Sequence, residues 1–131
     1  MKVIADTNVL IRAVLDDDPK QSPVAVATLR RADIVAIATP VLCEFVWVLA
    51  RGYKGPMAEL GAAIRTLVDS ANVAVNRPAV EAGLATLNAG GDFADGVIAF
   101  EGKWLGGETF VSFDQDAVKL LEQQGEAVRL L

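Results

Sequence analysis

Apolar and polar positions alternate in blocks along the chain, with short apolar blocks separated by longer segments of helical periodicity. The short blocks are rich in β-branched residues and predict strands that begin at Val3, Ile34, Val73, Thr109 and Ala127. In the longer segments apolar residues recur every three to four positions, which predicts helices. The order β-α-α-β-α-α-β-α-α-β-α-β therefore predicts an α/β fold, with a central parallel sheet of about five short strands flanked by helical layers.

Capping and helix-breaking residues set the ends of several predicted helices. Ser22 as N-cap and Pro23 at the first position predict a helix that ends near Arg31. The other helices are predicted from Val9 onward, over 41–51, over 57–68, over 80–87, from Asp92 onward and over 117–122. Gly96 lies inside one of them and costs about 1 kcal/mol relative to alanine, which predicts close packing at that position.

The first strand leads directly into polar residues. Lys2 is the only charge before Asp6, so the strand is an apolar run that suits the interior of a parallel sheet covered on both faces. Asp6, Thr7 and Asn8 then precede a helix, which places Asp6 at the carboxyl end of the strand. Ligands bind at that edge of open α/β sheets, so Asp6 is the first candidate site residue.

Other single carboxylates occupy comparable positions. Glu44 is alone in an otherwise apolar helix, Asp92 and Asp95 share one helix start, and Asp114 follows a strand. Each also has a structural interpretation. Glu44 can face solvent or form a salt bridge, Asp92 and Asp95 can form a capping box, and Asp114 can cap the last helix. The acidic run 16–18 before Pro19 predicts a solvated loop in preference to a metal site.

Length and composition predict a single soluble domain over 1–131. An apolar fraction of 53% is slightly high for such a domain and indicates that some apolar surface meets a partner. The only cysteine, Cys43, excludes an internal disulfide and fits a reducing cytoplasm. No apolar run approaches the roughly 18 residues of a membrane span, and no charged-then-apolar leader opens the chain, so we expect a cytoplasmic protein without membrane contact.

Charge and residue types narrow the chemistry. The net charge of −5 argues against a broadly basic surface that coats nucleic acid. The chain contains no histidine, which excludes serine–histidine and cysteine–histidine catalysis and any zinc site that needs imidazole. Carboxylates remain as the catalytic material, and a carboxylate cluster calls for a hard cation such as Mg²⁺ or Mn²⁺.

Four motifs follow one another along the chain. They are the segment 4–10 around Asp6, the helix that carries Glu44, the segment 92–99 with Asp95, and 112–114 with Asp114. In this order they resemble the PIN domain family, in particular the toxin ribonucleases of VapBC toxin–antitoxin pairs, and the resemblance covers nearly the whole chain. Gly96-Val97 stands where an alanine–leucine pair is more usual in the family, a departure that affects no expected ligand.

The resemblance implies an endoribonuclease that depends on Mg²⁺ or Mn²⁺. By position, its metal ligands and catalytic residues would be Asp6, Glu44, Asp95 and Asp114. One water on the ion would attack the RNA phosphodiester. The secondary candidates are Asp92 and Asp116 as further ligands, Thr7, Asn8 and Ser112 as donors to carboxylates or waters, and Arg12 as an RNA contact.

The resemblance also implies two protein partners, a second copy of the chain in a homodimer and a VapB-like antitoxin. Four large apolar residues bear on this expectation, namely Phe45, Trp47, Phe100 and Trp104. Core packing explains most of them, and the others would line a dimer face or an antitoxin groove.

Two rival functions come from other classes. A haloacid-dehalogenase-like phosphatase also begins with a strand and an aspartate, but it needs a second aspartate where this chain has Asn8. The other rival is a metal-free interaction module, which loss of activity on chelation would exclude.

Overall fold

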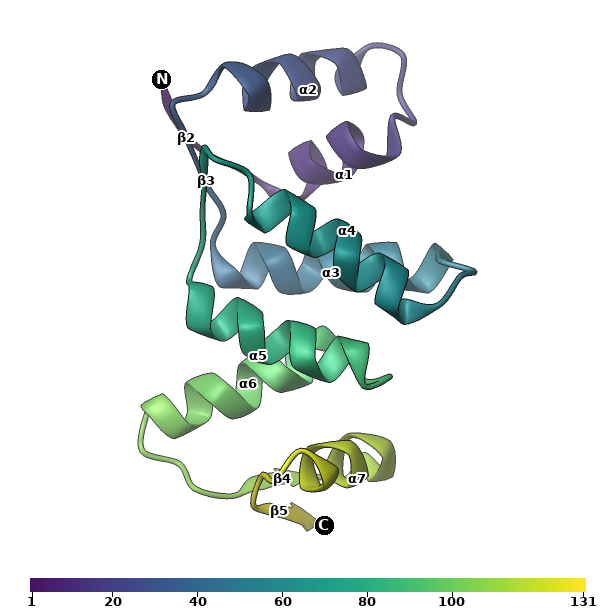
Figure 1. The fold of residues 1–131 in the computed structure, drawn as a ribbon, viewed down its shortest axis with the longest axis vertical. Coiled ribbons are helices and arrows are strands. Elements are labelled where there is room, and N and C mark those ends of the chain that lie inside the picture. Colours follow the sequence, from purple (N-terminus) through teal and green to yellow (C-terminus); the bar gives the residue numbers. More distant parts are fainter. The chain divides into compact units, whose positions relative to one another are not determined.

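The fold is described from a computed structural model that covers residues 1–131. The chain forms two compact units, one comprising Met1–Lys54 with Ala62–Asn76 and the other Gly55–Gly61 with Arg77–Leu131. Figure 1 shows the elements in chain order. The helix α4 (Met57–Val68) begins in the second unit and ends in the first.

The first unit contains a three-stranded parallel sheet with the order β1-β2-β3. Its strands are β1 (Lys2–Ile4), β2 (Ile34–Ala36) and β3 (Val73–Ala74). Val3 pairs with Val35, and Val35 pairs with Val73. The helices of this unit are α1 (Thr7–Leu15), α2 (Gln21–Arg31) and α3 (Thr39–Gly52), and α1 packs against both others. The buried apolar residues include Leu10, Ala25, Val35, Ile37, Leu42, Phe45, Val46 and Val68.

The second unit combines a helix pair with a two-stranded parallel sheet. The helices α5 (Arg77–Asn88) and α6 (Phe93–Trp104) pack against each other. The strands β4 (Phe110–Ser112) and β5 (Val128–Leu130) pair with Val111 opposite Arg129, and α7 (Gln115–Gln123) contacts both. The core of this unit includes Val80, Leu84, Leu87, Phe93, Val97, Val118 and Leu121.

Gly96 lies where α6 approaches α5. A Cβ atom at this position would collide with the carbonyl oxygen of Ala82 and with Oγ1 of Thr86. Oγ1 of Thr86 is fixed because it donates to the Ala82 carbonyl at 3.2 Å and contacts Oε1 of Gln124 at 3.1 Å. The close packing predicted from this glycine is therefore confirmed.

The predicted fold class is confirmed. The structure has seven helices and five strands in the predicted order, and every strand pair is parallel. The strands divide into a three-stranded and a two-stranded sheet. The expectation that β1 is an interior strand does not hold in its unit, where β1 forms the sheet edge and Ile4 is 85% exposed. An apolar run reports which residues suit a sheet, but it does not identify the neighbouring strands.

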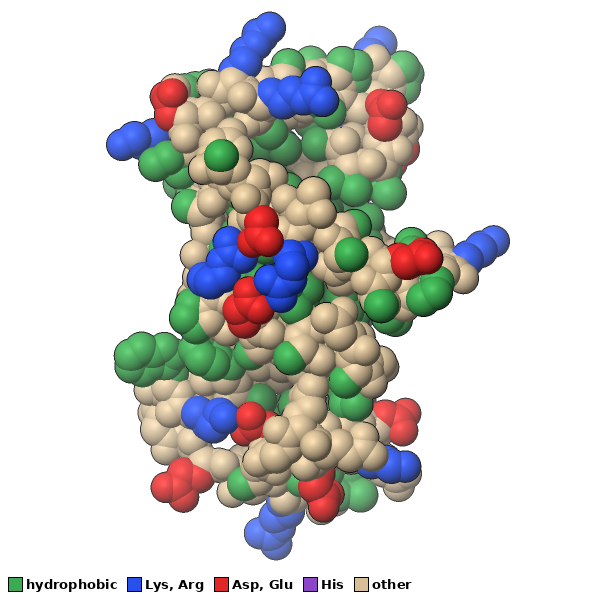
Figure 2. All heavy atoms as spheres, viewed as in Figure 1, with side chains coloured by type: hydrophobic (Ala, Val, Ile, Leu, Met, Phe, Trp, Pro, Cys, Tyr) green, Lys and Arg blue, Asp and Glu red, His purple; other side chains and the backbone are tan.

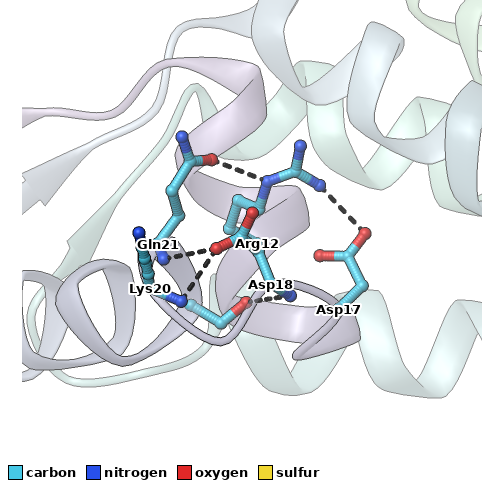
Figure 3. A network of polar contacts seen from close by, with 6 residues as sticks. Arg12, Asp17, Asp18, Lys20 and Gln21 are labelled. Carbon is cyan, nitrogen blue, oxygen red and sulfur yellow. Dashed lines mark hydrogen bonds and ion pairs between the residues drawn. The ribbon is translucent and has the colours of Figure 1, made fainter.

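The predicted start of α2 is wrong. The helix begins at Gln21, and Ser22 is fully buried in its first turn. Lys20 is the N-cap residue and its side chain makes no capping hydrogen bond. Asp18 supplies the acceptor instead, because its Oδ1 accepts the backbone N–H groups of Lys20 at 2.9 Å and Gln21 at 2.7 Å (Figure 3). Oγ of Ser22 accepts the backbone N–H of Asp18 at 3.2 Å in return. The solvated-loop interpretation of 16–18 holds, since Asp16 ends α1 and Asp17 pairs with Arg12 at 2.9 Å.

The helix α3, which is apolar in sequence except for Glu44 over most of its length, is buried on one side only. Phe45 and Val46 are buried, but Glu44, Trp47 and Val48 are exposed. Glu44 therefore faces solvent. Elsewhere on the molecular surface, acidic and basic side chains are interspersed on the face drawn in Figure 2. No helix is both long enough and apolar enough to cross a membrane.

Candidate functional site

The first unit contributes Asp6 and Glu44. Asp6 follows β1 and is the N-cap of α1, where Oδ1 accepts the backbone N–H of Thr7 at 2.9 Å. Its backbone is extended, which lets the side chain fold back over the first turn. Glu44 lies in the second turn of α3 and is exposed, and its side chain forms neither a hydrogen bond nor a salt bridge. The salt-bridge interpretation of Glu44 is therefore wrong.

The second unit contributes a group of aspartates around the start of α6. Asp92 is the N-cap of α6 and accepts the backbone N–H of Ala94 at 3.1 Å. Asp95 is half-buried in the first turn, and its side chain makes no hydrogen bond. The capping-box interpretation is therefore right for Asp92 and wrong for Asp95.

The charge state of Asp95 depends on its burial and on two other aspartates of this unit, Asp92 and Asp114. Burial raises the pKa of its carboxyl above the ordinary value of 3.8, and the carboxylates of Asp92 and Asp114 raise it further. The ionised form is disfavoured because both burial and like charges oppose a negative charge there. A cation bound beside these groups would relieve that repulsion.

Asp114 follows β4 and caps α7. Its Oδ1 accepts the backbone N–H groups of Asp116 at 3.0 Å and Ala117 at 3.2 Å. Oγ of Ser112 accepts the backbone N–H of Asp114 at 3.0 Å, which fixes the turn between strand and helix. Ser112 therefore supports the backbone of Asp114, and Asp116 is exposed in the first turn of α7.

The capping role leaves room for a second role. Asp6, Asp92 and Asp114 each use Oδ1 for the cap, and Oδ2 makes no hydrogen bond. An ionised carboxylate has about four lone-pair sites, so a capping aspartate can still offer an oxygen to a cation. Carboxylate oxygens are the donors that a hard cation such as Mg²⁺ or Mn²⁺ prefers.

The acids are distributed over both units, and the structure groups only some of them. Asp92, Asp95 and Asp114 interact electrostatically within the second unit, while Asp6 and Glu44 belong to the first. No group of three or more histidine, cysteine, aspartate or glutamate side chains stands in an arrangement that could hold a metal ion.

Arg12, the predicted RNA contact, is already engaged. Its Nε donates to Oε1 of Gln21 at 2.9 Å, and one terminal nitrogen pairs with Asp17 (Figure 3). Asn8 and Arg12 line a cavity of about 370 Å³ between α1 and α2. Thr7 is buried at the start of α1, so its hydroxyl does not face solvent as Asn8 does.

Sequence reasoning missed an aromatic contact on α3. The guanidinium carbon of Arg51 lies 4.3 Å from the centre of the Trp47 ring, a cation–π geometry. The signal was present in the sequence, since Trp47 and Arg51 are four residues apart in a predicted helix and therefore share one face.

The model of the PIN domain family matches residues 3–122, which include every candidate acid. The chain belongs to the PIN domain family. PIN domains are nucleases, a class of hydrolase that generally uses divalent metal ions, and membership indicates RNA as the substrate. No curated protein and no solved structure matches the chain.

Proposed function

We propose that this protein is a metal-dependent endoribonuclease that hydrolyses RNA phosphodiester bonds with Mg²⁺ or Mn²⁺. The observation that carries the proposal is the PIN family match over residues 3–122. The match spans parts of both compact units, which supports the interpretation of 1–131 as a single nuclease domain.

In this proposal Asp6, Glu44, Asp95 and Asp114 are the metal ligands and catalytic residues. Support comes from their free side-chain oxygens, because the carboxylates of Glu44 and Asp95 make no hydrogen bonds and each capping aspartate leaves Oδ2 unbonded. Two further acids, Asp92 and Asp116, are alternative ligands.

The roles of these residues follow from their charge and position. A bound divalent cation would supply Lewis acidity to the phosphodiester and lower the pKa of water. The carboxylates would hold the cation and orient water through their remaining lone pairs. Ser112 would act indirectly by fixing the backbone that presents Asp114. Thr7 and Asn8 are proposed as polar neighbours of Asp6.

We further propose that the protein is the toxin of a type II toxin–antitoxin pair in the cytoplasm. Its partners would be a second copy of the chain and a VapB-like antitoxin. Exposed apolar side chains, among them Trp104 at 77% exposure, support the presence of a partner. Cys43 is not in a disulfide, in keeping with a reducing compartment.

Purified protein freed of any bound partner tests the nuclease. We expect it to cleave structured RNA with Mg²⁺ or Mn²⁺ and to stop when EDTA is added. Asp114→Asn should abolish cleavage, while Glu122→Gln, an exposed acid on the same helix, should leave it unchanged. Undiminished cleavage in EDTA would refute metal dependence. Phosphate release from small monoesters without RNA cleavage would favour the phosphatase.

A further inference from the structure

An exposed stripe on α3 contains a candidate metal ligand, an aromatic ring and a cation. Glu44, Trp47, Val48 and Arg51 are spaced i, i+3, i+4 and i+7, so they lie on one face of the helix. All four are exposed, and the Trp47 side chain is 50% accessible. Buried Phe45 and Val46 anchor the opposite side, so the stripe is held on a rigid element.

The charge of Arg51 is available to a ligand. Its guanidinium lies 4.3 Å from the centre of the Trp47 ring and forms no salt bridge. The cation therefore stays close to the ring without an acid to neutralise it. An aromatic ring with an unpaired guanidinium over one of its faces matches a nucleotide. The base can stack on the other face of the ring or on the guanidinium plane, and the phosphate is negative.

The stripe lies on the same helix face as Glu44, one of the proposed metal ligands. Glu44 and Arg51 are seven residues apart, which is about 10 Å along the helix axis at 1.5 Å per residue. A nucleotide on Trp47 would therefore lie about one helical turn from Glu44. We infer that Trp47 and Arg51 form a stacking platform for an unpaired nucleotide of the RNA substrate, an inference that rests on the proposed function.

The chemistry specifies the kind of RNA. Stacking needs a base whose face is exposed, which unpaired nucleotides offer and the interior of a duplex does not. Stacking also tolerates any base, because every base has a π-face. The platform would thus select unpaired RNA over duplex RNA without reading its sequence, while Arg51 holds the adjacent phosphate.

Fluorescence can isolate this platform, because the chain has only two tryptophans. In the Trp104→Phe background Trp47 is the sole indole, and EDTA prevents cleavage. We expect a short oligoadenylate to quench Trp47 emission and the duplex of that oligomer with oligouridylate to quench it much less. Trp47→Ala should weaken binding of the oligoadenylate by about tenfold, and Trp47→Phe should retain most of it. Trp104→Ala is the matched control and should bind as the parent does.

Salt dependence tests the cation separately. For a single strand, each neutralised phosphate contributes about 0.7 to the slope of log affinity against log salt. Arg51→Gln should therefore lower that slope by about 0.7, whereas Trp47→Phe should not change it. An unchanged slope in Arg51→Gln would overturn the phosphate contact.

The outcomes separate this inference from the nuclease itself. Normal metal-dependent cleavage by Trp47→Ala, together with unchanged oligoadenylate binding, would overturn the platform and leave the nuclease standing. Quenching by oligoadenylate without any cleavage in Mg²⁺ or Mn²⁺ would support the platform and count against the nuclease. If Trp47 emission changed with protein concentration and not with RNA, the face would bind a second copy and the platform would be rejected.

Discussion

The carboxylates of Asp92 and Asp95 repel each other at the start of α6, and only Asp92 caps the helix. Burial raises the pKa of Asp95, and the Asp92 carboxylate three residues earlier raises it further. The Asp92 side chain accepts the Ala94 N–H, while the Asp95 side chain makes no hydrogen bond. A helix start that needs one carboxylate thus carries a second one at an energetic cost, which is typical of functional sites.

Replacing Asp95 by asparagine removes this charge and keeps the side-chain shape. We expect Asp95→Asn to abolish RNA cleavage while the metal-free variant is at least as stable as the parent. The parent should gain about 2.7 kcal/mol at a hundred times the dissociation constant of Mn²⁺, and the variant much less. Thermal melts of both proteins in EDTA and in Mn²⁺ measure these differences.

Asp92→Ala provides the comparison for a residue that does cap the helix. Without metal, its free energy of unfolding should be about 1 kcal/mol lower than that of the parent, and it should melt at a lower temperature, because the Ala94 N–H loses its acceptor. If Asp95→Asn also melted lower and responded to Mn²⁺ as the parent does, Asp95 would be a structural residue and the proposed site would be wrong.

The raised pKa of Asp95 also predicts a pH dependence. Since folding raises this pKa above the unfolded value near 3.8, the folded protein holds the proton more tightly. The resulting stabilisation is present below that value and is lost as the pH rises through the folded pKa. In EDTA the parent should therefore lose stability relative to Asp95→Asn as the pH rises from 3.8 through the folded pKa of Asp95. A difference in stability that stays constant over this range would contradict the assignment.

The packing around Gly96 predicts that alanine at this position destabilises the protein, whereas helix propensity alone would predict that it stabilises the protein. Gly96→Ala should destabilise the protein by about 1–3 kcal/mol, since its methyl group would collide with the Ala82 carbonyl and Thr86. Gly102 lies in the same helix with nothing within 4 Å of an added Cβ. Gly102→Ala should therefore stabilise by up to about 1 kcal/mol. Denaturant unfolding of both variants checks the pair, and equal effects would refute the packing argument.

The capping contacts of Asp18 predict that Asp18 stabilises the protein more than the adjacent Asp17 does. Asp18→Ala should lower the melting temperature more than Asp17→Ala, because Asp18 accepts two backbone N–H groups while Asp17 makes an exposed ion pair. The Gln21 and Lys20 N–H groups lower the pKa of Asp18 below 3.8. Its stabilisation is therefore present above pH 3.8 and is lost as the pH falls through the folded pKa. Melts at neutral and acidic pH measure both effects.

Much of the fold was readable from the sequence because helix periodicity and β-branched runs are local. The helix predicted over 57–68 has these bounds in the structure, and Gly96 correctly indicated tight packing. The error at Ser22 arose because Asp18 and Ser22 are both good capping residues, and only the loop geometry decides between them. The exposure of Trp47 was not predictable, since an apolar run does not reveal which side faces the core.

The candidate site was predictable as a set of residues but not as a geometry. The positions of Asp6 and Asp114 after strands follow from the element order, and both do cap helices. Whether a cap also binds a cation depends on which oxygen the cap uses, and no sequence pattern carries that information. The absence of a salt bridge at Glu44 likewise depends on tertiary neighbours.

The toxin role is tested in a bacterial host. Expression of the unmutated chain alone should arrest growth, and co-expression of an antitoxin should restore it. Asp114→Asn should relieve the arrest without loss of protein, because asparagine also caps helices well. Strong expression of the unmutated chain with normal growth and no bound partner would favour a PIN ribonuclease that is not a toxin.

The helix caps at Asp6, Asp92 and Asp114 have a consequence for how substitutions at these positions are inherited. A lineage that no longer needs the nuclease would still be selected for folding, and asparagine or serine would satisfy that requirement. If Asp6 and Asp114 hold the cation as proposed, a lineage that needs the nuclease would accept only aspartate at these two positions. Frequent asparagine at these positions among descendants would therefore mark lost activity in a retained fold, whereas Glu44, which caps nothing, would drift freely once activity is lost.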